Sequence, residues 1–386
     1  MSAYNWPLMK NTISVGDRLK LAKFVLTSDR FTAGNKVKQF EKEWSEWLGC
    51  KESLFVSSGS TANFLLLSSV KDLYGLKTGD KVLVPACTWV TNIAPVIQLG
   101  LTPVFCDINL QDFSFNIDHL KRISIHHPDI KAIFVTHLLG YSSKIEYYKR
   151  YFPDALILED VCESHGCVGS SGKKRGSEYI GGTFSFYFGH HMTTIEGGMI
   201  STNNEELADI MRMKRSHGLA RESKNFQKYK EENSEIISSF LFMTDGYNFR
   251  NTDLGAVLGI SQLKRLTGMV EKRNLNYDFY YKLVSQNDDK FFVPEYNKMI
   301  SSFAFPFICK TKEIKTKLIS LFEKYKIEYR PVVSGNLLKQ PFLKNYTLDF
   351  ENANVDILHE SGVYIANNHF VGKKEFKILE NILEQL

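Results

Sequence analysis

The sequence lacks long apolar runs and has few cysteines. No apolar stretch approaches the roughly 20 residues that a helix needs to cross a bilayer, so we expect no membrane span. The six cysteines lie far apart or in apolar context, and the first residues, MSAYNWPLMKNT, do not resemble a secretory signal. These two absences favour a reduced, cytoplasmic location.

A long run of basic residues is also missing. The formal net charge of +5 comes from 48 Lys and Arg against 43 Asp and Glu, spread over 386 residues. This distribution argues against a groove for nucleic acid. The small positive excess suits a substrate that carries a diphosphate, although ordinary surface balance explains it more simply.

The chain has the length and pattern of a two-domain protein. Its 43% hydrophobic and 24% charged residues suit one large core and a second, smaller one. Apolar strands alternate with helices up to Asp160, which predicts an α/β fold with a large, mostly parallel sheet covered on both faces. We predict a large domain at residues 10–255 and a smaller α+β domain at residues 256–386.

Three further segments carry predictions of their own. Residues 223–239 are charged and weakly patterned, which predicts a surface excursion. The apolar spacing then predicts a helix at 252–265 and a long helix at 269–284, leading into the smaller domain.

The stretch at residues 183–198, TFSFYFGHHMTTIEGG, has the layout of an active-site turn. A short aromatic strand at 184–188 leads into a turn with His190 and His191, and a second apolar run follows at 199–201. Binding and catalytic residues are concentrated on loops that a rigid sheet positions. Histidine also titrates near neutral pH, which suits a general base.

Two turns before this segment have features of a ligand site. SSGSTAN, at residues 57–63, places Gly59 and Ser60 at a helix N-terminus, where free backbone N–H groups suit a phosphate. The same residue types are ordinary N-caps. Trp89 follows a strand at 81–85 and is placed to stack on a planar ring or to pack in the core. Asp160 ends the strand of LILED, as a site carboxylate or as a helix cap.

Together with LEDVCES, GYNFR and YRPVVSGN, these motifs resemble the DegT/DnrJ/EryC1/StrS sugar aminotransferases, which have the type I fold of enzymes that use pyridoxal phosphate (PLP). The resemblance runs from about residue 10 to the C-terminus. In that family a lysine stands where this chain has His190, counted back from Glu196. Histidine at this position is similar to the branch of sugar 3-dehydratases that use pyridoxamine phosphate (PMP).

The replacement of lysine by histidine changes the implied chemistry. A lysine binds the PLP aldehyde covalently as an imine, whereas a histidine cannot. The resemblance therefore implies PMP held without a covalent bond and His190 free to act as the base, with His191 in a supporting role. The implied reaction removes the C3 hydroxyl from a nucleotide-linked 4-keto-6-deoxy sugar, first of all GDP-4-keto-6-deoxy-D-mannose, and L-glutamate regenerates PMP from PLP.

The resemblance also implies which residues hold the ligands. The cofactor would be held by its phosphate, ring, ring nitrogen and phenolic oxygen, by residues Gly59, Ser60, Ser185, Trp89, Asp160 and Glu163. Asn248, in GYNFR, would reach the cofactor phosphate of a second subunit, which implies a homodimer with a shared active site. The family uses the loop of His217 and Arg221 near its substrate, with Arg250 as a further ligand, although a basic cluster at a helix C-terminus explains the first two equally well. By residue type, Arg330 and Asn336 are candidate sugar or diphosphate ligands, or simply exposed loop residues.

Several alternatives stay open. The nucleotide could be GDP or CDP, and the sugar a hexose or a heptose. A complete aminotransferase making an amino sugar is a second candidate, against which the missing lysine argues, and a catalytically silent cofactor-binding scaffold is a third. Some relatives hold an iron–sulfur cluster through four grouped thiolates. No cysteine lies between Cys167 and Cys309, so we expect no such cluster and no metal.

Overall fold

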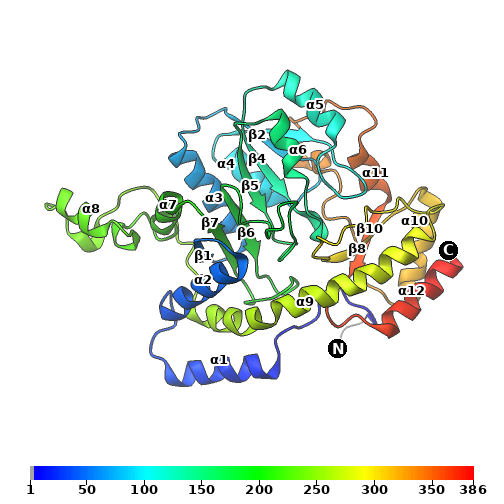
Figure 1. The fold of residues 1–386 in the computed structure, drawn as a ribbon, viewed down its shortest axis with the longest axis horizontal. Helices are drawn as coiled ribbons and strands as arrows, with labels where there is room; N and C mark the ends of the chain where they lie inside the picture. Colours follow the sequence, from blue (N-terminus) through cyan, green and yellow to red (C-terminus); the bar gives the residue numbers. More distant parts are fainter. Residues whose placement is uncertain (1–3) are drawn as a thin grey trace.

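A seven-stranded sheet forms the centre of the computed structural model, which describes residues 4–386 (Figure 1). Its order is β1-β7-β6-β5-β4-β2-β3, and only β7 runs against the other strands. The strands are β1 Glu52–Val56, β2 Lys81–Pro85, β3 Thr102–Cys106, β4 Ile130–Thr136, β5 Leu156–Asp160, β6 Gly181–Ser185 and β7 Gly198–Thr202. The predicted mostly parallel sheet is therefore confirmed.

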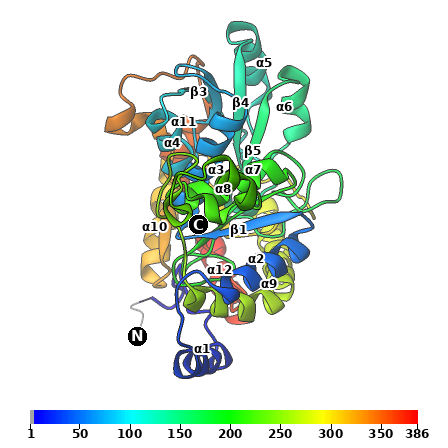
Figure 2. The same cartoon turned by 90° about the vertical axis from the view of Figure 1, so that its left-hand side faces the viewer.

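Helices cover both faces of this sheet because its strands are apolar on both sides. Leu54 and Val56 of β1 point to one face with α3, α4 and α7, while Phe55 points to the other with α2 and α9. Further along the sheet, α5 and α6 cover that second face (Figures 1 and 2). These helices are α2 Asn35–Leu48, α3 Gly59–Leu73, α4 Ala94–Gln98, α5 Ile117–His126, α6 Ile145–Tyr151, α7 Glu205–Arg215 and α9 Asp253–Ser285.

A second, antiparallel sheet of three strands has its own apolar core. Its order is β8-β10-β9, from β8 Ala304–Ile308, β9 Tyr329–Pro331 and β10 Gly362–Ala366. The helices α10 Lys312–Lys324, α11 Asn354–Ser361 and α12 Lys373–Gln385 accompany it. Trp6, near the start of the chain, is buried in the same core and forms a parallel bridge with Ile327. The N-terminal residues thus pack with C-terminal ones.

Two of the sequence-predicted boundaries are wrong. The strand expected at 184–188 ends at Ser185, so the reactive turn begins earlier than its aromatic residues suggest. The two helices expected at 252–265 and 269–284 are a single helix of 33 residues, α9, although Gly268 interrupts its apolar pattern. The division at residues 255 and 256 stays a prediction, and it falls within the first turn of α9.

Helix α1, Val15–Thr27, lies outside these layers and packs against α9 (Figure 1). Its buried Asp17 pairs with Arg265 of α9 at 2.8 Å and accepts a hydrogen bond from Ser261 at 2.6 Å. The outer side of α1 exposes Leu19 and Leu26 to solvent.

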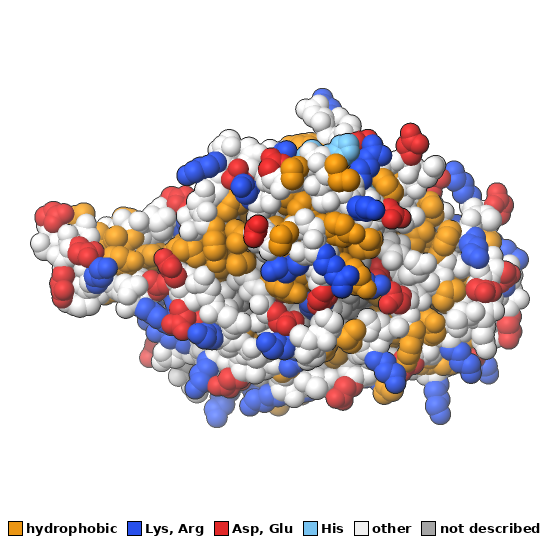
Figure 3. All heavy atoms as spheres, turned by 45° about the horizontal axis from the view of Figure 1, so that its top comes forward, with side chains coloured by type: hydrophobic (Ala, Val, Ile, Leu, Met, Phe, Trp, Pro, Cys, Tyr) orange, Lys and Arg blue, Asp and Glu red, His pale blue; other side chains and the backbone are white. Residues whose placement is uncertain are grey.

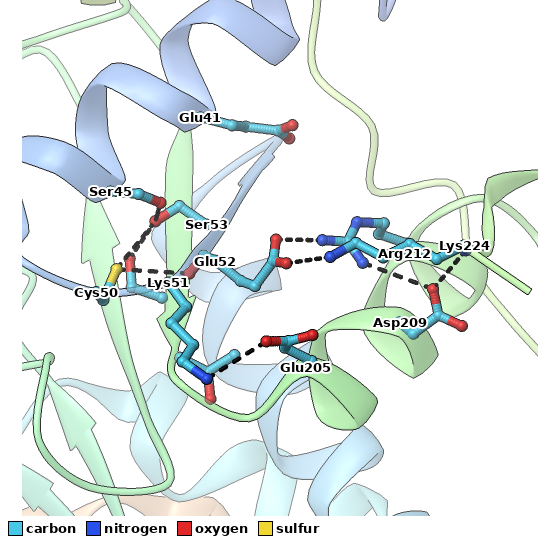
Figure 4. A network of polar contacts seen from close by, with 12 residues as sticks. Glu41, Ser45, Cys50, Lys51, Glu52, Ser53, Glu205, Asp209, Arg212 and Lys224 are labelled. Atoms are coloured by element: carbon cyan, nitrogen blue, oxygen red, sulfur yellow. Dashed lines mark hydrogen bonds and ion pairs between the residues drawn. The ribbon is translucent and has the colours of Figure 1, made fainter.

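Residues 223–243 form an arm that projects from the body of the molecule and contains helix α8, Phe226–Glu232 (Figure 1). The predicted surface excursion is therefore present. Its base is fixed by polar contacts: Lys224 pairs with Glu52 of β1, and its backbone N–H donates to Asp209 at 2.8 Å (Figure 4). Among residues 4–386 no helix is long and apolar enough to cross a membrane.

Candidate functional site

A cavity of about 470 Å³ lies where the main sheet meets the smaller one. Its walls come from the carboxyl ends of β4, β5 and β6, the N-terminus of α3, and residues of the smaller sheet. Ligands of open α/β sheets bind at this edge. Eight of the predicted site residues line the cavity, namely Gly59, Ser60, Trp89, Asp160, Glu163, Ser185, His190 and Arg330.

The N-terminus of α3 is built to bind an anion. Ser58 caps the helix by accepting from the Thr61 N–H, while the N–H groups of Gly59 and Ser60 form no hydrogen bond within residues 4–386. A side chain on Gly59 would bring its Cβ to 2.7 Å from the Cβ of Ser185. The small residue thus keeps this corner open, and the helix end and the Ser185 hydroxyl fit a phosphate group.

Asp160 is held at the end of β5 by two donors. Its side chain is 4% exposed, and its oxygens accept from the Asn63 amide at 2.8 Å and from the Cys162 N–H at 2.9 Å. The Asn63 amide is itself fixed because its oxygen accepts from Thr183 at 2.5 Å. A carboxylate oriented in this way fits the role of partner to a protonated ring nitrogen. Trp89, whose side chain is 56% exposed, lines the same cavity and leaves a ring face open for stacking.

Glu163 can hold a proton near neutral pH. Its pKa is raised to about 7, chiefly by burial and also by the charge of Asp160, while the hydrogen bond from the Leu139 N–H at 2.9 Å acts in the opposite direction. A carboxyl group in this state can either donate to or accept from a phenolic oxygen.

His190 has the geometry of a general base. Its Nδ1 lies 2.7 Å from the carbonyl oxygen of Cys162, so Nδ1 must carry the proton and donate it. The other ring nitrogen, Nε2, is therefore unprotonated, and it forms no hydrogen bond within the described residues. Burial lowers the pKa of His190 to about 4, which keeps it neutral at physiological pH. Phe303 packs against the ring at a centroid distance of 5.4 Å.

His191 is in a different environment and does not line the cavity. Its side chain is fully buried, and Nε2 lies 3.0 Å from the Ser301 hydroxyl and 3.1 Å from the Ser301 carbonyl oxygen. Its ring also packs against His165 and Phe303. These contacts fit the supporting role expected of it.

Four predicted residues lie outside the cavity, namely His217, Arg221, Asn248 and Arg250. We call the three that Arg250 joins by its contacts, His217, Asn248 and Arg250 itself, the Asn248 patch. Arg250 Nε donates to the Asn248 side chain at 3.1 Å, and its Nη2 lies 3.4 Å from His217 Nε2. His217, Arg221 and Asn248 are exposed. Within one chain these side chains do not reach the cavity.

Asn336 also lies outside the cavity, and its side chain is already used. It is 5% exposed, accepts from the Leu338 N–H at 3.0 Å and donates to Asp356 at 3.0 Å. These bonds stabilise the turn after β9, and the expected substrate role of Asn336 stays a prediction. Arg330, by contrast, lines the cavity mouth from β9 with an exposed side chain.

The cavity contains residues that the sequence did not identify. The N-terminal segment contributes Met9 and Lys10, and α9 contributes Arg273. Neither segment carries a motif, and both lie far along the chain from the His190 turn. Asn63, which orients Asp160, could have been identified from the sequence, because it ends the SSGSTAN motif one helical turn after Gly59.

Comparisons with known proteins agree with this geometry. The model of the DegT/DnrJ/EryC1/StrS aminotransferase family matches residues 14–361. The GDP-4-keto-6-deoxy-D-mannose 3-dehydratase of Yersinia pseudotuberculosis is 34% identical over 392 residues, covering 99% of this chain and 98% of the relative.

Solved structures give the same picture. The E. coli GDP-4-keto-6-deoxy-D-mannose 3-dehydratase with bound hydrated PLP superposes with a TM-score of 0.91 at 30% identity, covering 99% of this chain and 100% of that one. A structure of a GDP-4-keto-6-deoxymannose 3-dehydratase with a trapped PLP–glutamate adduct has a TM-score of 0.89 at 31% identity, covering 98% and 100% of the two chains. The predicted α/β fold of PLP-dependent transferases is thus confirmed.

Proposed function

Because this chain belongs to the DegT/DnrJ/EryC1/StrS aminotransferase family, we propose that it is a PMP-dependent dehydratase of a nucleotide-linked 4-keto-6-deoxy sugar. The observation that carries this proposal is His190, which stands in place of the family's lysine with Nδ1 bonded to the Cys162 carbonyl and Nε2 free. The named relatives support GDP-4-keto-6-deoxy-D-mannose as the first substrate to test.

The residues of the cavity fit the cofactor. Gly59, Ser60 and Ser185 would bind its phosphate, Trp89 would cover its ring, and Asp160 would keep the ring nitrogen protonated. When bound, PMP supplies the amine that condenses with the C4 ketone and the electron sink that lets the C3 hydroxyl leave.

His190 is placed to move the proton in this reaction. Its neutral Nε2 would take a proton from the carbon that carries the cofactor's amine. The protonated imidazole would later return a proton and become neutral again. Glu163 would share its proton with the phenolic oxygen. A lysine would remain bound to the cofactor, whereas histidine leaves the amine free to react with the sugar.

The active site is completed by a second copy of the chain in this proposal. The Asn248 patch is exposed and does not reach its own cavity. Beside it, the arm exposes large apolar side chains, Ile237 at 73%, Phe240 at 67% and Phe242 at 54%. Hydrophobic side chains form an orange surface along the projecting arm on the left of Figure 3. An exposed apolar surface of this kind marks a protein interface. A homodimer would bury it and bring Asn248 to the partner's cofactor phosphate.

The decisive experiment uses purified protein with PLP, L-glutamate and GDP-4-keto-6-deoxymannose. We expect release of ammonia and a sugar product with one oxygen less. An amino sugar would instead establish a transaminase. No change in the sugar would direct the search to CDP-linked and heptose substrates, and binding of cofactor without any turnover would favour the scaffold.

A further inference from the structure

Arg273 is a buried cation without a carboxylate partner. It lies on α9, is 2% exposed and contributes to the cavity wall. No ion pair within residues 4–386 includes it. Burying a charge without a counter-charge is unfavourable, so an unpaired buried arginine at a cavity wall points to a bound anion that supplies the counter-charge.

The hydrogen bonds of Arg273 leave one edge of the guanidinium unused. Nη1 faces three backbone carbonyl oxygens, those of Ser302 at 3.4 Å, Phe303 at 3.1 Å and Asn367. Nε is buried with no partner, and Nη2 forms no hydrogen bond among the described residues. The edge formed by Nε and Nη2 matches the two oxygens of a carboxylate.

The surrounding contacts hold this edge in place. The Asn367 amide donates to the backbone oxygen of Arg273 at 2.9 Å and to the Ser302 hydroxyl at 3.0 Å. Asn276, one turn further along α9, donates to the Asn367 side-chain oxygen at 3.1 Å. The guanidinium is therefore preorganised, which lowers the entropic cost of binding a ligand. Its pKa is lowered by burial to about 9, so it stays charged at neutral pH.

Its position favours a ligand that reacts beside His190. The guanidinium carbon lies 6.0 Å from the centre of the Phe303 ring, and that ring packs directly on His190. The phosphate corner at Gly59 adjoins Ser185 and Cys162 instead. The two exposed cations of the cavity, Lys10 and Arg330, are available to a large diphosphate. A small anion that leaves water completely is the better match for Arg273.

We propose that Arg273 binds a carboxylate group of the amino donor, L-glutamate, while the donor reacts in the cavity. This inference rests on the proposed function, in which glutamate returns the cofactor to its amine form. Arg273 would then select an amino acid with a carboxylate at the right place and would leave binding of the nucleotide sugar to other residues.

The test uses glutarate, which carries both carboxylates of glutamate and has no amine to react. Calorimetric titration of the PLP-loaded protein should give a glutarate Kd at least about tenfold weaker in Arg273→Gln than in wild type. Arg273→Lys keeps the charge without the fork and should also bind about fivefold to tenfold more weakly. Lys264→Gln, an exposed position on the same helix, is the control with the same charge loss and should bind glutarate normally.

The outcomes separate this proposal from its rivals. If Arg273→Gln does not fold, Arg273→Lys decides, and wild-type glutarate binding in that variant overturns the proposal. Weaker binding of GDP with unchanged binding of glutarate would assign Arg273 to the diphosphate and would overturn it as well. A single turnover of PMP-loaded protein with the sugar needs no glutamate, so its failure in the wild type would refute the proposed function and leave the glutarate result to stand on its own.

Discussion

The cavity and the Asn248 patch differ in how complete they are. In the cavity, Asp160, Glu163 and His190 each have a fixed hydrogen-bond partner from the same chain. In the patch, Asn248 and Arg250 bond mainly to each other, at the surface. The same motif-based argument predicted both groups. The difference teaches that one chain arranges its own acid–base groups completely, while the patch is the part that a second subunit would use in the proposed homodimer.

The largest effect is expected from breaking the cavity at His190. In His190→Asn the free Nε2 is lost, so kcat for dehydration should fall by about 10² to 10⁴-fold, while the cofactor still binds. A single turnover of PMP-loaded protein and the bound cofactor content measure the two quantities. His191→Asn is the matched control and should lose less than about tenfold. Normal turnover in His190→Asn would transfer the base role to another residue.

A smaller effect is expected from breaking the patch at Asn248. Asn248→Ala should retain the fold of the chain but hold PLP about tenfold more weakly, because one hydrogen bond to a charged group is lost. Gel filtration and equilibrium dialysis measure the state of assembly and the affinity.

Mixing the two variants sharpens the comparison. A mixed dimer of His190→Asn and Asn248→Ala has one site with both defects and one site with neither. At a PLP concentration that leaves most sites of Asn248→Ala empty, both parent proteins are nearly inactive, and subunit exchange should restore about a quarter of the wild-type activity. A mixture that stays as inactive as its components would show that both residues serve the cavity of their own chain.

The pH dependence of stability tests how deeply the His190 ring is built into the cavity. Its pKa is about 4 in the folded protein and about 6.5 when unfolded, so the unfolded chain binds more protons between these values. The stability that the neutral ring contributes above pH 6.5 is therefore lost as the pH falls toward 4. Between pH 6.5 and 4, the free energy of unfolding should therefore fall less steeply in His190→Asn than in the wild type, by up to about 1.4 kcal/mol per pH unit. Chemical unfolding at several pH values measures this dependence. If the free energy of unfolding changes equally with pH in both proteins, the lowered pKa of His190 is contradicted.

The smallest effect concerns the turn that joins the two regions. Asn251, next to the patch, donates to the carbonyl oxygen of Glu196 at 3.3 Å, and Glu196 lines the cavity. Before it stands Ile195, a β-branched residue with a φ of +75°. Ile195→Gly should relieve this strain and raise the free energy of unfolding by about 1 kcal/mol. Thermal unfolding checks the sign, and destabilisation would show that the Ile195 side chain makes contacts worth more than the strain.

The sequence predicts those parts of the fold and site that depend on local patterns. The turn at Gly59 and the strand that delivers Asp160 follow from apolar runs and small residues at their ends. The continuity of α9 was not predicted, because Gly268 interrupts a pattern that buried contacts on both sides of it maintain. Local propensity could not weigh those contacts.

Residues that enter the site from distant segments were beyond sequence reasoning. Arg273 is one of two arginines on α9 and belongs to no motif, and only the fold places it beside Phe303. Asn336 shows a different limit: as a polar loop residue it looked available, whereas its side chain bonds to Leu338 and Asp356, and its substrate role stays a prediction. The roles proposed for the Asn248 patch still await a test.

Helix α9 has a consequence for dissecting the protein into fragments. It is 33 residues and about 50 Å long, and its first half packs through Leu263 and Leu266 under the main sheet. Its second half packs through Tyr277 and Tyr280 in the other core. A gene cut between residues 255 and 256 would give a C-terminal piece with the first of these apolar faces in solvent. That face is buried only against the N-terminal piece, so the two pieces are expected to depend on each other for folding.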